Sequence, residues 1–482
     1  MGHTMRNLLS TIAAAAIGCA FATHAFGANV AEVYQAALEN DPVLGAAKQD
    51  YAARGEIVPQ ARAGLLPNVN LNATTSYNRL EYPHGNMLDT DPASPTFGQL
   101  KGIPGDEFND HTWQAQLVQP LIDVSAYYTY KSSQALKAQA AQDFVAAQQN
   151  LIVRTVSAYL EVLRSQAALE STTAEEAAVK RQQEQVQQRF DVGLVAITDV
   201  LDATAAYDNV VVLRIQAERD QGIQFETLYT LTGQSYQEVD QISTTLPIVN
   251  PTSVDEDYWV TLALANNPNV LSSRQAKIAA EKDLRAKEGA FLPTLDGVVS
   301  YNQDVNHVES FLGSGLGTVG DKSNTRTYAL QFQLPIYQGG YTLSKVREAR
   351  ARLLQSGEVL RNNEWVVSRD TRNLLRTVTT DVIRVRARIK AIKSAESALE
   401  ATQTGYEVGT RNIVDVLQAQ QRLYSSQFDY ADSRYNYVRD LMLLKQSAGT
   451  LAPDDVGRLN TYIDPQQPVR RLNAISENGQ IE

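Results

Sequence analysis

Apolar side chains recur at helical spacing along two long stretches of the chain. In the first stretch, Ile152, Val156, Tyr159 and Leu163 lie four, three and four residues apart. The second stretch has the same spacing at Val378, Val382, Val385, Ile389 and Ile392. This spacing is typical of helices that pack as coiled coils. It predicts long helices over about 125–190 and 342–407, each roughly 100 Å long at 1.5 Å per residue.

Shorter segments alternate between apolar side chains and polar, mostly amide-bearing ones, as strands do. The alternation predicts strand pairs over about 68–121 and 294–337. An apolar face opposite a polar face suits a barrel wall between lipid and water. It also suits a soluble sandwich whose core lies on the apolar face. In the first strand, one face carries Val69, Leu71, Ala73, Thr75 and Tyr77, and the other carries Asn70, Asn72, Thr74, Ser76 and Asn78.

Four strands cannot close a barrel by themselves. Open strand edges are not tolerated in lipid, where unpaired backbone groups find no water, and the smallest single-chain bacterial barrels have about eight strands. If these strands cross a membrane, several chains must therefore contribute to one barrel. On these grounds, eight strands from a dimer and twelve strands from a trimer are both possible.

The same order of elements occurs twice, which predicts a tandem duplication. Residues 37–42 (ALENDP) match residues 263–268 (ALANNP), 226 positions later, and residues 190–193 (FDVG) match residues 406–409 (YEVG), 216 positions later. Each copy is predicted to have a first helix, a strand pair, a long helix, a turn and a returning helix. The first helices run over about 30–64 and 255–289, the turns lie at Gly193 and Gly409, and the returning helices end near Gly233 and Gly449.

The first residues have the features of a secretory signal. Arg6 gives a positive start, an apolar stretch runs from Leu8 to Ala22, and the small residues around Gly27 favour a cut before Ala28, although a cut after Ala25 also fits. The chain's single cysteine, Cys19, lies in this segment, where it is either inert or the lipidated residue of a lipoprotein signal. The predicted division is a signal peptide at 1–27, repeats at 28–250 and 251–452, and a C-terminal tail at 453–482.

Composition removes several classes of function. The net charge of −11 over 482 residues argues against nucleic-acid binding. A mature chain without cysteine has no disulfide, thiolate metal site or cysteine nucleophile, and the five histidines are scattered rather than at ligand spacing. No acid–base pair or Ser–His–Asp arrangement can be singled out. We therefore predict no enzyme, no cofactor and, because no later apolar run reaches about 18 residues, no transmembrane helix.

Three motifs resemble the signatures of TolC-family outer-membrane proteins. They are GLVAITDV at 193–200, LPIYQGG at 334–340 and YEVGTRNIVDVL at 406–417, and the likeness covers about residues 29–455. The resemblance implies an α+β membrane protein. In the homotrimer it implies, four strands per chain form one twelve-stranded barrel in the cell outer membrane. This barrel would be continuous with a long periplasmic α-helical coiled-coil barrel, surrounded by an equatorial collar.

The resemblance also implies a passive exit duct for multidrug efflux or type I protein secretion. Its partners would be outer-membrane lipid, a periplasmic adaptor (membrane fusion) protein and an inner-membrane transporter of the RND, ABC or MFS type. Drugs and secreted proteins fit equally well as cargo. From the helices alone, a non-conducting periplasmic scaffold or adaptor is the alternative, but the alternating strands favour the channel because an adaptor needs no amphipathic hairpins.

By motif position, the resemblance places a periplasmic gate at Thr198, Asp199, Tyr406 and Arg411. Polar links between these groups would hold the closed tip. An arginine–carboxylate link is strong when it is partly desolvated, yet a partner that offers competing contacts can break it. The alternative is that Asp199 and Asp415 only cap the helices that follow the two turns.

The resemblance places a pore constriction at Asp415 and Gln418. In an oligomer Asp415 would form an anionic ring, which favours cations. The best-known family members carry a second aspartate where this chain has Gln418, so the ring is expected to be weaker here. Adaptor-contact tips fall on Val192, Gly193 and Leu194 and on Val408, Gly409 and Thr410, although a sharp turn is by itself a sufficient reason for glycine.

Two further segments are interpreted as irregular. Residues 315–320 fit the dinucleotide pattern G-x-G-x-x-G, but a strand rather than a helix follows them, so we interpret them, like residues 83–110, as a flexible surface loop. The segment after about 452 has three prolines and little periodicity. It is predicted to be a flexible or collar-wrapping tail.

Overall fold

The computed structural model describes residues 27–81, 86–102, 106–308 and 322–472. Residues 1–26 of the predicted signal segment, with Cys19, and the glycine pattern at 315–320 lie outside these residues. The chain divides into two compact units, one formed by residues 1–50, 142–271 and 362–482 and the other by residues 51–141 and 272–361. Each repeat therefore contributes to both units.

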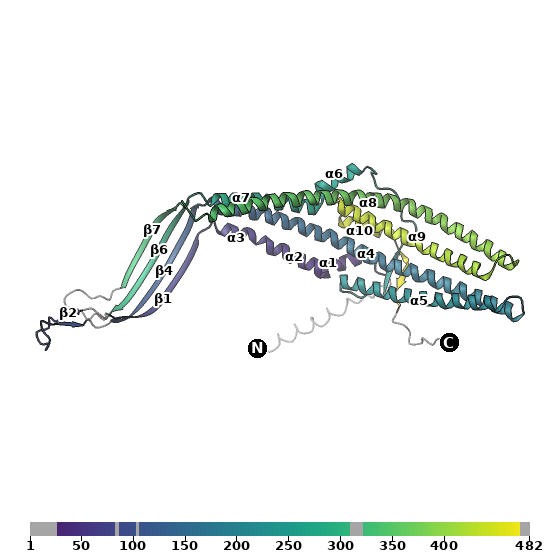
Figure 1. Ribbon diagram of the computed structural model, residues 1–482, viewed down its shortest axis with the longest axis horizontal. Coiled ribbons are helices and arrows are strands. Elements are labelled where there is room, and N and C mark those ends of the chain that lie inside the picture. The colour runs from purple at the N-terminus through teal and green to yellow at the C-terminus, as the bar shows by residue number, and fades with distance from the viewer. Residues whose placement is uncertain (1–26, 82–85, 103–105, 309–321, 473–482) are drawn as a thin grey trace, which may run out of the picture. The chain divides into compact units, whose positions relative to one another are not determined.

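The long helices confirm the predictions closely. They are α4 (Val124–Asp191) and α8 (Tyr341–Glu407), and the returning helices are α5 (Ile197–Thr232) and α9 (Ile413–Ser447). Figure 1 shows each long helix leading through a short turn into its returning helix. None of the helices in the described parts of the chain is long and apolar enough to cross a membrane.

The predicted coiled-coil seams are mostly buried. All four residues of the first seam are buried, and so are Val378, Val382 and Val385 of the second. The second prediction is wrong at its end, because Ile389 is exposed and Ile392 is only partly covered within one chain. No side chain of α8 between residues 386 and 400 is buried, so the chain itself supplies little to pack against there.

The first helix of each repeat is broken, contrary to the prediction of one continuous helix. The first copy has α1 (Val30–Asn40), α2 (Pro42–Gly55) and α3 (Ile57–Ala63), and the second has α6 (Glu256–Asn266) and α7 (Pro268–Gly289). The breaks at Asp41 and Asn267 precede prolines, which disfavour helical backbone in the residue before them. Asp41 Oδ2 accepts from the Leu44 N–H at 2.7 Å, and Asn267 Oδ1 accepts from the Asn269 N–H at 2.9 Å. Each therefore caps a new helix with proline at its first position.

Both predicted strand pairs are present and join into one antiparallel sheet. Its strands are β1 (Asn68–Leu80), β4 (Asp106–Ile122), β6 (Thr294–Val308) and β7 (Lys322–Gln333), in the order β1-β4-β6-β7 (Figure 1). The second pair ends at Gln333, short of the predicted 337, and Pro335 follows. The large apolar side chains of the two outer strands are exposed: Val69, Leu71, Tyr77, Tyr328, Leu330 and Phe332.

The loop predicted over 83–110 contains a second, smaller hairpin among its described residues. Strands β2 (Asn86–Leu88) and β3 (Leu100–Gly102) pair there. The buried Asp89 accepts hydrogen bonds from Ser94 Oγ at 2.5 Å and Thr96 Oγ1 at 2.6 Å. These bonds, the Ser94 bond above all, hold the pKa of Asp89 well below its ordinary value. The interpretation of the whole segment as a flexible loop is therefore wrong over residues 86–102, and also over residues 106–110, which belong to β4.

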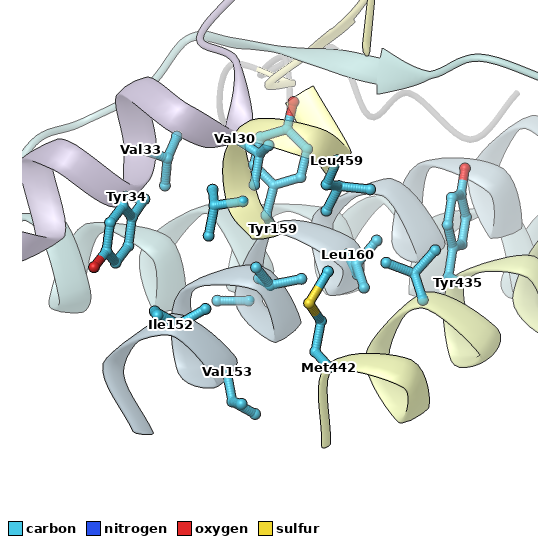
Figure 2. Close-up of a cluster of buried hydrophobic side chains, with 14 of the residues drawn as sticks. Val30, Val33, Tyr34, Ile152, Val153, Tyr159, Leu160, Tyr435, Met442 and Leu459 are labelled. Atoms are coloured by element: carbon cyan, nitrogen blue, oxygen red, sulfur yellow. The ribbon is translucent and has the colours of Figure 1, made fainter. Parts of the chain in front are cut away.

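The tail is also more ordered than predicted. Helix α10 (Pro453–Asn460) is followed by β8 (Ile463–Arg470), which pairs antiparallel with β5 (Glu238–Ile242). A flexible tail is thus the wrong interpretation for residues 453–470. These elements border the main core, where Val30 and Val33 of α1, Tyr159 of α4, Met442 of α9 and Leu459 of α10 converge (Figure 2).

Candidate helix-tip gate

Both long helices end in the same backbone turn. After α4, the Leu194 N–H donates to the Arg189 carbonyl at 2.8 Å. After α8, the Thr410 N–H donates to the Gly405 carbonyl at 2.8 Å. Such a bond back over the last helical turn belongs to the Schellman cap, which satisfies carbonyls left open at a helix end. The duplication has therefore kept the turn geometry in both copies.

Each turn contains a glycine in the left-handed region and an exposed apolar rim. Gly193 has a φ of 75° and Gly409 a φ of 77°, which side chains with a Cβ rarely adopt. Val192 is 69% exposed, Leu194 74% and Val408 69%, and Thr410 is exposed as well. The six predicted adaptor-contact residues thus lie in two surface turns whose apolar side chains are uncovered within one chain.

An apolar cluster beneath the turns joins the two repeats. Its fully or nearly buried members come from α4, α5 and α9, and Phe190 and Tyr406 pack against it from the ends of α4 and α8. This packing brings the tips of both helical hairpins together in one unit. The buried members are Val186, Val200, Ala203, Ile413 and Val416.

The predicted gate residues are only partly in contact within one chain. Arg411 Nη1 lies 3.8 Å from Asp415 Oδ2, in an exposed ion pair. The Asp199 carboxylate has no partner among the described residues, and Thr198 is exposed. The hydroxyl of Tyr406 is buried without a hydrogen-bond partner among those residues. The link from Arg411 to Asp199 therefore stays a prediction.

The two aspartates that open the returning helices differ in their local role. Asp415 forms a capping box with Asn412, because the Asp415 N–H donates to Asn412 Oδ1 at 2.9 Å while the Asn412 N–H donates to Asp415 Oδ2 at 3.4 Å. Ala196 is the residue before α5, and no side chain caps that helix. Capping thus accounts for Asp415 but not for Asp199.

The predicted constriction residues lie on the first two turns of α9. Gln418 Oε1 accepts from Arg422 Nη2 at 3.4 Å, so the position that lacks a second aspartate is occupied by a neutral side chain with a basic neighbour. Asp415 keeps one carboxylate that is partly exposed. The local charge is therefore mixed rather than purely anionic.

Two residues at the tip were missed in the sequence. The Arg189 guanidinium lies over the Tyr406 ring, 5.1 Å from its centroid, a cation–π contact between the repeats. A Cβ on Gly405 would lie 2.8 Å from Arg411 Cγ, so the absent side chain leaves room for the arginine stem. Arg189 and Gly405 are equivalent at the 216-residue offset, and this divergence was the signal that could have identified both.

Comparison with known proteins gives a consistent result. A family model described as "Outer membrane efflux protein" matches residues 33–234 and 259–450, one match in each repeat. The chain is 33% identical over 458 residues to the outer membrane protein TolC of Vibrio cholerae, covering 95% of this chain and 98% of that protein. It is 26% identical to the alkaline protease secretion protein AprF of Pseudomonas aeruginosa, over 97% and 94% of the two chains.

The fold resembles solved channel structures as well. The CmeC outer membrane channel of Campylobacter jejuni superimposes with a TM-score of 0.68 at 17% identity, covering 91% of this chain and 90% of that one. At this identity the likeness concerns the fold alone. A coverage of 91% of this chain includes both repeats.

Proposed function

Because the chain belongs to the outer membrane efflux protein family, a family of outer-membrane channels, we propose that three copies form one exit duct. The duct would cross the outer membrane with the strands and extend through the periplasm with the long helices. It would receive drugs or secreted proteins from an inner-membrane transporter through a periplasmic adaptor. The family's description as efflux proteins and a relative named for alkaline protease secretion support these two cargo classes.

The open sheet is the observation that carries this proposal. Strands β1 and β7 each pair with one strand only among the described residues, and their large apolar side chains are exposed. Lipid would cover the apolar side chains, but it cannot satisfy the free backbone groups of two edges. The edge of one copy must then pair with the opposite edge of the next. Three copies would give twelve strands, an ordinary size for such barrels.

Cross-linking tests the number of copies. The predicted mature chain has no cysteine, so Val69→Cys on β1 with Tyr328→Cys or Leu330→Cys on β7 introduces the only reactive pair. These positions lie at similar levels of the sheet, since Val69 faces Leu117, Leu117 faces Val299 and Val299 faces Tyr328. A short bifunctional reagent should give species of up to three chains. A limit of two chains would contradict the trimer.

A matched pair controls for chance collision. Leu117→Cys with Val299→Cys lies in the interior of the same sheet, where the two residues are direct partners of one chain. This variant should cross-link only within a chain. If the interior pair gave as many cross-linked dimers and trimers as the edge pair, the strand edges would not be the contact between chains.

Conductance separates the duct from a non-conducting scaffold. The purified protein in a planar bilayer should show small and stable single-channel currents, because a closed tip leaves a narrow path. Protein that is folded and migrates anomalously without heating, yet gives no current, would favour the scaffold.

We further propose that the two tip turns bind the adaptor. Val192, Leu194 and Val408 offer exposed apolar contact area on turns that are closed by backbone hydrogen bonds, and a preformed turn has less conformational entropy to lose on binding. Exchanging Leu194 and Val408 for Ser should weaken adaptor cross-linking in cells without lowering the conductance of the purified channel. Unchanged cross-linking would remove the tips from the adaptor interface.

Asp415 is proposed to line the narrowest part of the pore. Three copies would form a carboxylate ring that favours cations, weakened by the neutral Gln418 and its neighbour Arg422. Asp415→Asn should shift the reversal potential in a salt gradient toward the value of an unselective pore. An unchanged potential would leave Asp415 with its capping role alone.

A further inference from the structure

A buried carboxylate without a counter-ion lies beside the start of the predicted mature chain. Asp240, in β5, is 2% exposed, and its Oδ1 has no hydrogen-bond partner among the described residues. A buried charge is costly unless it is paired. Among the described residues, no cationic side chain pairs with it.

The neighbour of this carboxylate is the segment around Ala28. The Ala28 N–H donates to the Glu238 carbonyl at 3.0 Å, and the Asp240 N–H donates to the Ala28 carbonyl at 3.2 Å. The Tyr159 hydroxyl fixes the same corner by donating to the Asp240 carbonyl at 2.5 Å and to the Ala28 carbonyl at 3.3 Å. A Cβ on Gly27 would overlap Asp240 Oδ1. The carboxylate thus faces the backbone that enters Ala28.

We propose that secretory cleavage before Ala28 creates the missing counter-ion, and that the new α-ammonium pairs with Asp240. Water adds across the Gly27–Ala28 peptide bond under the action of a signal peptidase. Gly27 leaves with the carboxylate, and the released Ala28 nitrogen gains protons to become an ammonium group. One of its protons can keep the bond to the Glu238 carbonyl. The others face the space that Gly27 vacates, beside Asp240 Oδ1.

The surroundings favour a cation at this position. Glu32 of α1, Glu238 of β5 and Asp464 of β8 are the charged groups that act on Asp240 besides burial, and all are acidic. Glu238 already pairs with Arg470 at 2.9 Å. With residue 27 still attached, burial first and then these acids raise the pKa of Asp240 to about 6. A new positive charge would relieve both effects.

The same geometry decides between the two candidate cleavage sites. A cut after Ala25 would leave Phe26 and Gly27 in front of Ala28 and would move the ammonium group away from the Glu238 carbonyl. The mass of the N-terminal peptide of protein purified from outer membranes should therefore correspond to a start at Ala28. A start at Phe26 would overturn the proposal.

Labelling of the α-amine tests the pair directly. Native wild-type protein and Asp240→Asn are treated with an acetylating reagent near pH 7.5, and the N-terminal peptide is quantified by mass spectrometry. At this pH, raising the pKa of the α-amine by one unit from its ordinary value of about 7.7 to 8.0 lowers the reactive, unprotonated fraction about six- to eightfold. The wild-type amine should react about six- to eightfold more slowly than the amine of Asp240→Asn. Equal rates would overturn the proposal.

Asp381→Asn is the matched control. Asp381 of α8 is likewise fully buried, with one oxygen that lacks a partner among the described residues, and burial raises its pKa to about 6. It contacts Arg384 and Asp440 rather than the chain start. This variant should leave the labelling rate unchanged. Faster labelling in both variants would indicate general loosening and would overturn the specific pair.

The pair also has a pH signature in stability. The folded pKa of a paired α-ammonium lies above its unfolded value of about 7.7 to 8.0, so its contribution is full below that value and is lost as the pH rises through the folded pKa. The wild-type thermal midpoint should fall above about pH 8 more than that of Asp240→Asn. Parallel curves would contradict the pair.

Discussion

The two helix tips share a backbone but differ in chemistry. At both, a bond over the last turn and a left-handed glycine reverse the chain. In the first copy Ile197 is 50% exposed and nothing caps α5, whereas in the second copy the equivalent Ile413 is fully buried and a capping box opens α9. The start of α9 is thus buried and capped, whereas the start of α5 is half exposed and has no side-chain cap.

The difference lies in the side chains rather than in the turn backbone. A left-handed turn must stay the same in both copies because its geometry is imposed by the chain reversal. The side chains around it are free to diverge, as Arg189 and Gly405 do and as Ala196 and Asn412 do. Ile197 and Ile413 keep the same residue but differ in burial. The two tips therefore share the turn but not the burial and capping of the residues that follow it.

Truncating the buried isoleucine should have the largest effect. Ile413→Ala removes a fully buried side chain from the tip cluster and should cost about 2 to 5 kcal/mol of unfolding free energy. Ile197→Ala, its equivalent, should cost less than about 1 kcal/mol because its side chain is half exposed. Denaturant unfolding in detergent measures both. Equal costs would contradict the proposed asymmetry.

Substituting the turn glycines should affect both copies alike. Gly193→Ala and Gly409→Ala each place a Cβ in the left-handed region, at about 1 to 2 kcal/mol, and no atom lies near enough to clash. Similar losses of stability are therefore expected in the two variants. Clearly unequal losses of unfolding free energy would mean that the two turns do not share the same backbone constraint.

The side-chain cap of α9 should be removable there and reproducible at the start of α5. Asn412→Ala removes the capping box and should cost about 1 kcal/mol. Ala196→Asn should gain up to about 1 kcal/mol, because the backbone there is already extended and Asp199 stands where Asp415 stands in the other copy. Local hydrogen exchange at the starts of α5 and α9 would report the change. No gain in protection at α5 would indicate that Asp199 is engaged elsewhere.

Much of the fold could be predicted because its determinants are local. The spacing of apolar residues predicted the long helices, and the duplicated glycines and prolines predicted the positions of the turns and repeats. The breaks at Asp41 and Asn267 were also encoded, in the proline that follows each, but amphipathic spacing across them suggested one helix. Strand β8 was hidden because Pro465 and Pro468 interrupt its pattern and its partner β5 is more than two hundred residues away.

The sequence predicted where the tip residues lie, but not which acidic side chain pairs with Arg411. Motifs identified Tyr406, Arg411 and Asp415, and all three lie at the second tip. Which acid Arg411 meets depends on packing between helices that no motif encodes. In one chain it lies near Asp415 at 3.8 Å, a weak exposed pair, and room for its stem comes from the missing side chain of Gly405.

The claim that Arg411 holds the tip closed is tested most directly by single-channel conductance. Arg411→Ala should change stability by less than about 1 kcal/mol yet clearly raise the small conductance of the wild type. Arg388→Ala is the control, since it removes an ion pair between Arg388 of α8 and Asp429 of α9 at 2.7 Å, and it should leave the conductance unchanged. A conductance indifferent to Arg411→Ala, or raised equally by both variants, would contradict the account.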